Sequence, residues 1–548
     1  MTNEKRPMLG LQGPVLAWQD PWAGDASDRI MRTGTGQVYR SQDPTPTGEA
    51  FVRAMKELGA EFYVHHLMPG LEGQAAMLRD LVRLDMKVCL GNEYGNINGP
   101  WAEGTNRYDA PDDAVLEAAR TGKLIGLLYD EPEHLQINAS QYRKDGWFPH
   151  WAATDGQTLE QSYGRFVHAV AERVRHVGAL LRQAGLAEEA VPLVSEQVFP
   201  VLFHANARAG MAVCPKVMKE SFQPLQLAAA LGAAKQYGRP LWICADLWGP
   251  DVGRWFTRMS GFPGHSPEEF ASALEMGYLM GPTHLFAENI DVLLRHEGEG
   301  RFASTEFGDV WRRFALDFVP RHPLDWRHDE AEADIALIHS DDSNYGQNAR
   351  LFGNRTLEAP EASRSVFRAW HLLSRGAIPA HGSCMHIPGY NFPRHELKRR
   401  VPPESFPLPD GCPDLPATST HPLFYPANNV LVFDEFVREE QLGEPKLVIA
   451  AGSRLSAETL RALRRKAEAG TAVIVSAGLV PAEWKESRRF GAGFWLTADD
   501  FLSDAVREAA EPFLGAENCW RQRFGRTEVR FTPGNEAGTT LQAEFVRG

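Results

Sequence analysis

The sequence has few cysteines and no long hydrophobic run. Its six cysteines lie far apart among 548 residues and form no C-x-x-C pair, so we expect no disulfide framework, no metal site and no cofactor. No apolar stretch approaches the ~20 residues that span a bilayer, and residues 1–10 lack signal-peptide character. We therefore expect no membrane partner and a cytoplasmic location by default, or a periplasmic or secreted one if a signal peptide was removed.

Positive charge is also scarce relative to negative charge. The chain has 57 Lys and Arg against 71 Asp and Glu, a formal net charge of -14, and nucleic-acid binding generally requires a basic face. We therefore expect no nucleic-acid partner. At 548 residues the chain exceeds what one hydrophobic core normally organises, so the length predicts two or three domains.

Short apolar runs alternate with amphipathic stretches from Gly13 to about Pro320, as in repeated βαβ units with a parallel sheet. Eight such repeats predict a (β/α)8 barrel, whose active site lies at the carboxyl ends of the strands. The sixth strand has the weakest pattern. The predicted strands are Pro14–Asp20, Glu61–Leu67, Lys87–Glu93, Leu124–Glu131, Val191–Val198, Met211–Val217, Leu241–Trp248 and His284–Asp291.

A second βα series starts with the apolar run at 335–339 and is clearest from Lys446 to Ser476. Two apolar runs there flank a predicted helix that Ser456 caps and Gly470 ends. The segment SRLSAETLRALRRKAEAG between the two runs resembles the trimerisation domain of family 42 β-galactosidases, a flavodoxin-like domain related to class I amidotransferases. The resemblance covers about 334–485. It implies a carbohydrate substrate and a homotrimer.

The chain is therefore expected to be an α/β protein with three domains. Residues 1–330 would form the (β/α)8 catalytic barrel and residues 331–488 the flavodoxin-like domain. Residues 489–548, with their alternating segments, would form a small β-rich C-terminal domain.

Glycosidic cleavage requires two carboxyl groups, one that protonates the leaving oxygen and one that attacks the sugar or activates water. In the fourth predicted strand, Asp130 and Glu131 stand where the apolar run stops. Asp130-Glu131-Pro132 resembles the Asn-Glu-Pro pattern of clan A glycosidases. The resemblance implies that Glu131 is the acid/base, with Asp130 in place of the usual substrate-binding asparagine.

The second catalytic carboxylate has two candidates. Clan A places its nucleophile after the seventh strand, which here ends with Asp246. The eighth strand offers Glu288, beside Asn289. We prefer Glu288, because a glutamate at this position has no evident role in the core, and a miscounted sixth strand would move it to the nucleophile position. If the count holds, Asp246 takes that position and Glu288 binds substrate. A retaining mechanism is expected.

Other residues at the predicted strand ends are candidates for substrate binding. Asp20 ends the first strand, His65 the second, Glu93 the third and Glu196 the fifth, and Asn289 follows Glu288 in the eighth. Trp248 could stack against a sugar, and Lys216 could contact an acidic or sulfated sugar, although a lone lysine is more often solvated.

Two other functions use similar residues. A metal-dependent sugar isomerase or epimerase would bind a divalent ion through Glu131, His134, Asp246 and Glu288. A non-catalytic carbohydrate-binding protein would keep the aromatic residues but need no pair of closely spaced carboxyl groups.

Overall fold

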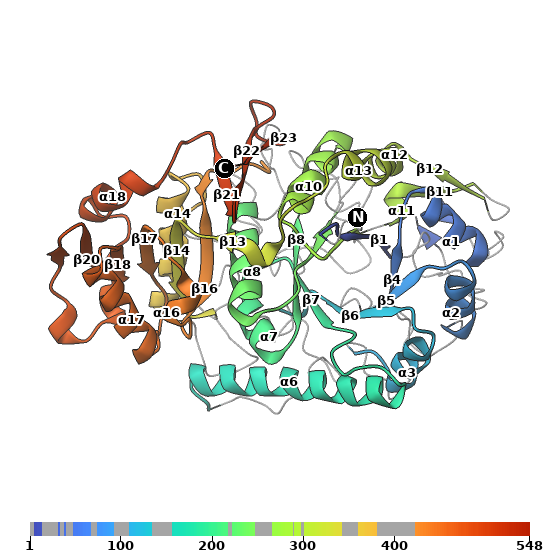
Figure 1. The fold of residues 1–548 in the computed structure, drawn as a ribbon, viewed down its shortest axis with the longest axis horizontal. Coiled ribbons are helices and arrows are strands. Elements are labelled where there is room, and N and C mark those ends of the chain that lie inside the picture. The colour runs from blue at the N-terminus through green and yellow to red at the C-terminus, as the bar shows by residue number, and fades with distance from the viewer. Residues whose placement is uncertain are drawn as a thin grey trace, which may run out of the picture.

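In the computed structural model, a closed barrel of eight parallel strands precedes two further sheets (Figure 1). The structure describes residues 5–13, 31–32, 38–39, 48–66, 74–92, 109–133, 156–217, 222–246, 266–288, 290–297, 301–341, 360–380 and 422–547. No helix among these residues is both long and apolar enough to cross a membrane.

The barrel strands pair in chain order, and the first closes against the last. The predicted strands from the second to the eighth all overlap observed strands, including the weak sixth. The barrel strands are β1 (Met8–Gln12), β4 (Phe62–His66), β5 (Lys87–Asn92), β6 (Leu124–Asp130), β7 (Leu193–Gln197), β8 (Ala212–Val217), β9 (Trp242–Ala245) and β10 (His284–Ala287).

The prediction of the first strand at 14–20 was wrong, because β1 occupies this place in the barrel. Its sequence MLGLQ contains a glycine and a glutamine, which weaken the apolar signal. Gly10 is needed there, since a Cβ atom would lie 2.4 Å from the ring of Phe62. Residues 14–20, which were predicted to form the first strand, lie outside the described residues.

Helices cover the outside of the barrel, and the capping signals of the sequence are present. Ser266 and Glu269 form a capping box at the start of α10, and Gly59 follows α1 with a positive φ of 88°. The helices are α1 (Gly48–Glu57), α2 (Gln74–Arg83), α3 (Asp112–Arg120), α6 (Leu159–Gln183), α7 (Phe203–Ala209), α8 (Gln223–Tyr237), α10 (Pro267–Leu279), α11 (Ile290–Leu293), α12 (Glu306–Arg313) and α13 (Val319–Arg321), with a π-helix at Phe314–Phe318 between the last two. Hairpins pair β2 (Met31–Arg32) with β3 (Val38–Tyr39) and β11 (Leu294–His296) with β12 (Phe302–Ser304).

The second sheet has the strand order β16-β14-β17-β18-β20-β19. Its five parallel strands follow the flavodoxin order 2-1-3-4-5, which confirms the predicted fold class. Its elements are β14 (Ile335–His339), α14 (Ser365–Leu373), β16 (Val430–Asp434), α16 (Glu439–Leu442), β17 (Leu447–Ala450), α17 (Ala457–Glu468), β18 (Ala472–Ser476), β19 (Arg488–Phe490) and β20 (Gly493–Ala498). Ser456 caps α17 as expected.

The predicted domain end at residue 488 falls inside this sheet. β20 pairs with β18 in parallel, and β19 forms an antiparallel edge. Residues 488–498 therefore belong to the second domain. The β-rich region comes later, after α18 (Asp504–Ala510), and its sheet also recruits two short earlier strands. It contains β13 (Ala331–Glu332), β15 (Ala427–Asn428), β21 (Trp520–Phe524), β22 (Thr527–Pro533) and β23 (Leu541–Arg547).

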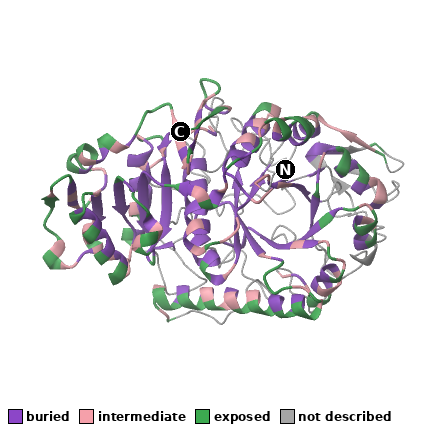
Figure 2. Ribbon diagram, viewed as in Figure 1, coloured by how far each residue is buried: buried purple, intermediate pink, exposed green. Residues whose placement is uncertain are grey.

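Helix α8 lies between the barrel and the second sheet, where it faces β16 (Figure 1). All its residues except Lys235 and Tyr237 are buried, as expected for a helix that packs on both sides. By contrast, α6 exposes one whole face (Figure 2). The contact with β16 is closest at Gly232, where an added Cβ atom would lie 1.6 Å from the carbonyl oxygen of Val432.

Replacing Gly232 with alanine should therefore destabilise the protein. The methyl group would force α8 away from β16, and overpacking of this kind costs about 1–3 kcal/mol. The matched control is Gly164→Ala on exposed α6, where an added Cβ meets nothing within 4 Å. It should stabilise the helix by roughly 0.5–1 kcal/mol. Urea unfolding of both variants measures the difference, and equal stabilities would contradict the packing argument.

Candidate active site

The carboxyl ends of the barrel strands bring polar side chains together inside the mouth. Alternate residues on each strand face the interior, where they form a small apolar cluster that includes Leu128, Val194, Cys214, Cys244 and Phe286. Two residues further along six of the strands, the same face carries a polar or charged group. These groups are Gln12, Asp130, Glu196, Lys216, Asp246 and Glu288, all of which are buried.

Lys216 lies among four carboxylates. Its Nζ atom lies 2.8 Å from both Asp130 Oδ1 and Glu288 Oε2, 3.2 Å from Glu131 Oε1 and 3.9 Å from Glu196 Oε1. The lysine side chain is only 1% exposed. The ammonium group therefore supplies the positive charge that allows several carboxylates to be buried together.

The four carboxylates differ in how far they reach toward solvent. The side chains of Glu131 and Glu288 are each 10% exposed, whereas those of Asp130 and Glu196 are 3% and 0% exposed. Glu131 and Glu288 are thus the members of the cluster that a substrate could reach most directly. Asp130 and Glu196 lie deeper beside the ammonium.

The backbone at Glu131 is held in an unusual conformation. Its φ is 46°, a value that non-glycine residues rarely adopt and that is often found at functional sites. Its N–H donates to the carbonyl of Glu196 at 2.8 Å. Two residues later, the Glu133 carboxylate accepts hydrogen bonds from the N–H groups of Val198 and Phe199. These contacts fix the turn after β6 against the segment after β7.

Burial and charge shift the pKa values of two members of the cluster. Burial raises the pKa of Glu196 well above its ordinary value, and Asp130 and Glu288 raise it further, although Lys216 opposes the shift. Burial alone would lower the pKa of Lys216, but Asp130, Glu288, Glu196 and Glu131 together raise it well above its ordinary value. Lys216 is therefore a permanent cation.

The structure brings together most of the described residues that the sequence singled out. Asp130, Glu131, Glu196 and Glu288 surround Lys216, so this lysine is buried in ion pairs rather than solvated. Asp246 follows β9, the seventh strand, and is 2% exposed. The predicted residues Asp20, Glu93, Trp248 and Asn289, and the alternative metal ligand His134, lie outside the described residues.

His65 does not join this cluster. It shares a face of β4 with Tyr63, a residue of the core between barrel and helices, and the two ring centroids lie 5.6 Å apart. Its predicted role in substrate binding is therefore not supported, because alternation turns it away from the barrel interior.

Two residues of the mouth were missed by the sequence analysis. Gln12 ends the misplaced first strand, and its Nε2 atom lies 3.5 Å from Glu196 Oε2. Cys244 Sγ lies 3.9 Å from Glu288 Oε2. Correct placement of β1 would have identified Gln12, whereas nothing in the local sequence separates Cys244 from an ordinary buried cysteine.

Donor atoms of Glu196, Cys244 and Glu288 lie within 4.8 Å of one another, close enough to share a metal ion. However, the ammonium of Lys216 is only 2.8 Å from Glu288. A divalent ion in the same place would be repelled by this fixed positive charge. The described residues of the mouth therefore fit a built-in cation better than a metal centre.

No family model and no curated protein matches the sequence. Among solved structures, the chain is similar to the β-galactosidase from Bacillus circulans sp. alkalophilus, with a TM-score of 0.53, 10% identity, and coverage of 97% of this chain and 94% of that one. It is also similar to the polyextremophilic β-galactosidase from the Antarctic haloarchaeon Halorubrum lacusprofundi, with a TM-score of 0.50, 9% identity, and coverage of 91% and 96%. The predicted resemblance to β-galactosidases is thus confirmed for the fold, over nearly the whole chain.

Replacing Glu196 with glutamine should change how stability depends on pH. A carboxyl group whose pKa is raised by folding contributes most below its ordinary pKa of 4.5, and this contribution is lost as the pH rises toward the folded-state value. Relative to wild type, Glu196→Gln should therefore gain stability progressively above about pH 4.5. Urea unfolding across pH, with exposed Glu189→Gln as the control, measures this gain. A difference that stays constant with pH would contradict the shifted pKa.

Proposed function

We propose that this chain is a retaining glycoside hydrolase in which Glu131 is the acid/base and Glu288 the nucleophile. The observation that carries the proposal is the pair of partly accessible glutamates at the carboxyl end of the barrel, both of which contact the Lys216 ammonium. The fold supports the same proposal, because enzymes with this barrel place their chemistry at this end.

The separation of the two glutamates fits a retaining mechanism. Glu131 Oε1 and Glu288 Oε2 each contact Lys216 Nζ, at 3.2 and 2.8 Å, so these oxygens lie no more than about 6 Å apart. Retaining enzymes hold their two carboxyl groups roughly 5–5.5 Å apart, whereas inverting enzymes need roughly 6.5–9.5 Å to admit a water molecule. A protein that only binds carbohydrate needs no such pair.

In the proposed reaction, Glu288 attacks the anomeric carbon while Glu131 donates its proton to the leaving glycosidic oxygen. The bond between the sugar and this oxygen breaks, and a covalent glycosyl-enzyme forms at Glu288. Glu131, now a carboxylate, then takes a proton from water as the water attacks the same carbon. This second displacement releases Glu288 and restores the original anomeric configuration.

Lys216 and its deeper partners prepare this pair. The ammonium lies closer to Glu288 than to Glu131, and a nearby cation stabilises a carboxylate anion, as a nucleophile requires. Asp130 also contacts the ammonium, at 2.8 Å. Asp246 remains the alternative nucleophile. The sixth strand is present, so the strand count holds and Asp246 follows the seventh strand, where clan A places its nucleophile.

The substrates that we propose first are β-galactosides, because the two solved structures compared above are β-galactosidases. A metal-dependent sugar isomerase is less well supported, since the ammonium of Lys216 already neutralises the carboxylates that would bind the metal.

The catalytic roles can be tested by replacing Glu131 with glutamine. The variant cannot donate a proton, so turnover of an unactivated glycoside should fall by roughly 10²–10⁴-fold. Activated aryl glycosides should lose less in the glycosylation step, because a good leaving group needs little protonation. Steady-state kinetics on both substrates measure the two effects. Full activity of Glu131→Gln on the unactivated glycoside would exclude this role.

Glu288→Gln and Asp246→Asn should be compared on the same activated glycoside. The residue that forms the covalent intermediate stays essential even with a good leaving group, so Glu288→Gln should be the more damaging change. NMR of the first-formed wild-type product should show the retained anomer. Greater loss in Asp246→Asn would transfer the role to Asp246, and an inverted product would exclude the covalent mechanism.

We also propose a homotrimer, because the second domain resembles a trimerisation domain in sequence and has the expected strand order. Multi-angle light scattering at micromolar concentration should give three chain masses. A stable monomer would contradict the proposal without affecting the assignment of the catalytic pair.

A further inference from the structure

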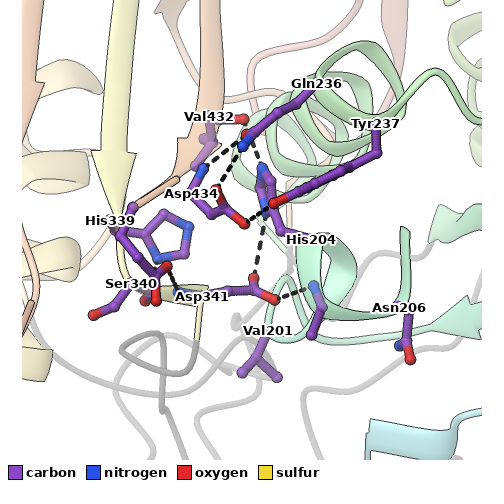
Figure 3. Close-up of polar contacts among 12 residues, drawn as sticks. Val201, His204, Asn206, Gln236, Tyr237, His339, Ser340, Asp341, Val432 and Asp434 are labelled. Atoms are coloured by element: carbon purple, nitrogen blue, oxygen red, sulfur yellow. Dashed lines mark hydrogen bonds and ion pairs between the residues drawn. The ribbon is translucent and has the colours of Figure 1, made fainter. Parts of the chain in front are cut away.

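A second buried polar cluster joins the barrel to the second sheet, away from the catalytic pair. It consists of His204, on α7 after the fifth barrel strand, together with His339 and Asp341, at and just after the end of β14. Their exposed fractions are 0%, 1% and 0%. Figure 3 shows these side chains converging from the two domains. We call them the interdomain cluster.

The hydrogen bonds of His204 determine which nitrogen carries its proton. Nε2 lies 3.0 Å from the carbonyl oxygen of Val432, which can only accept, so Nε2 carries a hydrogen. Nδ1 lies 3.3 Å from Asp341 Oδ1. In the neutral ring this contact would place a nitrogen lone pair against a carboxylate oxygen. The lone pair of His204 Nδ1 and the carboxylate oxygen of Asp341 therefore require a proton or a metal ion between them.

Hydrogen bonds to backbone groups also orient His339 and Asp341. His339 Nδ1 lies 2.8 Å from the carbonyl oxygen of Ser340, so it donates there and leaves the ring lone pair on Nε2. The second oxygen of Asp341 accepts the N–H of Ala205 at 2.8 Å. Backbone groups thus hold the far side of each side chain, as is usual for metal ligands.

The spacing of the donor atoms fits a small divalent ion. One donor atom from each of the three side chains lies within 4.8 Å of the others. The 3.3 Å between His204 Nδ1 and Asp341 Oδ1 is close to the ~3.3 Å expected between two ligands of a tetrahedral ion with bonds of about 2.0 Å. Two imidazoles and one carboxylate form a common zinc-binding set.

The surrounding charge also favours a cation. Asp434 and Glu435, at the end of β16, are 0% and 2% exposed. Asp434 accepts hydrogen bonds from Gln236 and Tyr237, and Glu435 pairs with Arg454 at 2.9 Å. With Asp341, three carboxylates are buried in this region, and buried anions are costly unless positive charge compensates them.

We propose that His204, His339 and Asp341 bind a divalent transition metal of the zinc class, which fastens the barrel to the second domain. A water molecule would complete a tetrahedral shell. Because its ligands are buried, the metal has a structural role, and the proposal is independent of the glycosidase assignment.

The test measures zinc in the purified full-length chain after dialysis against low zinc, together with its Tm with and without added ZnCl₂. Wild type should retain one zinc per chain, and ZnCl₂ should raise the Tm of the metal-depleted protein by about 3–5 °C. His339→Gln and Asp341→Asn should lose both effects. In Asp341→Asn, the new amide can donate to His204 Nδ1, so this variant should still fold.

Two control variants separate this site from other donors. His176→Gln alters an exposed histidine on α6, and Cys244→Ser alters the donor set in the barrel mouth. Both should keep the zinc. If Asp341→Asn fails to fold, metal content and Co²⁺ absorption of His339→Gln decide the matter. The proposal is overturned if wild type binds no zinc, if His339→Gln binds it like wild type, or if only Cys244→Ser loses it. If wild type binds no zinc, a proton on His204 supplies the positive charge between His204 and Asp341.

Discussion

One buried ammonium group holds the mouth of the barrel together. Lys216 contacts carboxylates that follow or end three other strands, β6, β7 and β10. Without this cation, burying so many carboxylates would cost several kcal/mol for each ion. Barrel closure places these strand ends around β8, and the alternation of side chains turns Lys216 inward. The charge balance of the proposed active site is therefore built from groups that no single βα unit contains.

Depth within the mouth divides the carboxylates into two kinds. The side chains of Asp130 and Glu196 are almost fully shielded from solvent, and Asp130 contacts the ammonium at 2.8 Å. Glu131 and Glu288 extend further toward solvent. The positive φ of Glu131 belongs to this arrangement, since it lets the chain turn directly after Asp130. Two adjacent acidic residues can then contact the same ammonium from different depths.

The second domain supports the barrel wall behind this site. Helices α7 and α8 follow the strands that carry Glu196 and Lys216, and both contact the second sheet. At Gly232 the backbones approach so closely that no side chain fits, and at His204 the contact is polar and buried. An interface with both a close backbone contact and a buried polar network permits little sliding. It thereby limits movement of β7 and β8.

The sequence by itself determined the architecture and two catalytic candidates. Apolar runs that stop at acidic residues identified Glu131 and Glu288, and the helix cap at Ser456 was identified as well, because these signals depend only on neighbouring residues. Only the tertiary structure decided that Lys216 is buried among carboxylates, that Gln12 joins them, that His65 faces the helices, and that His204 meets Asp341. Each of these facts depends on which distant strand ends and helices come together. Local periodicity does not encode that proximity, which arises when the barrel closes and the second sheet packs against it.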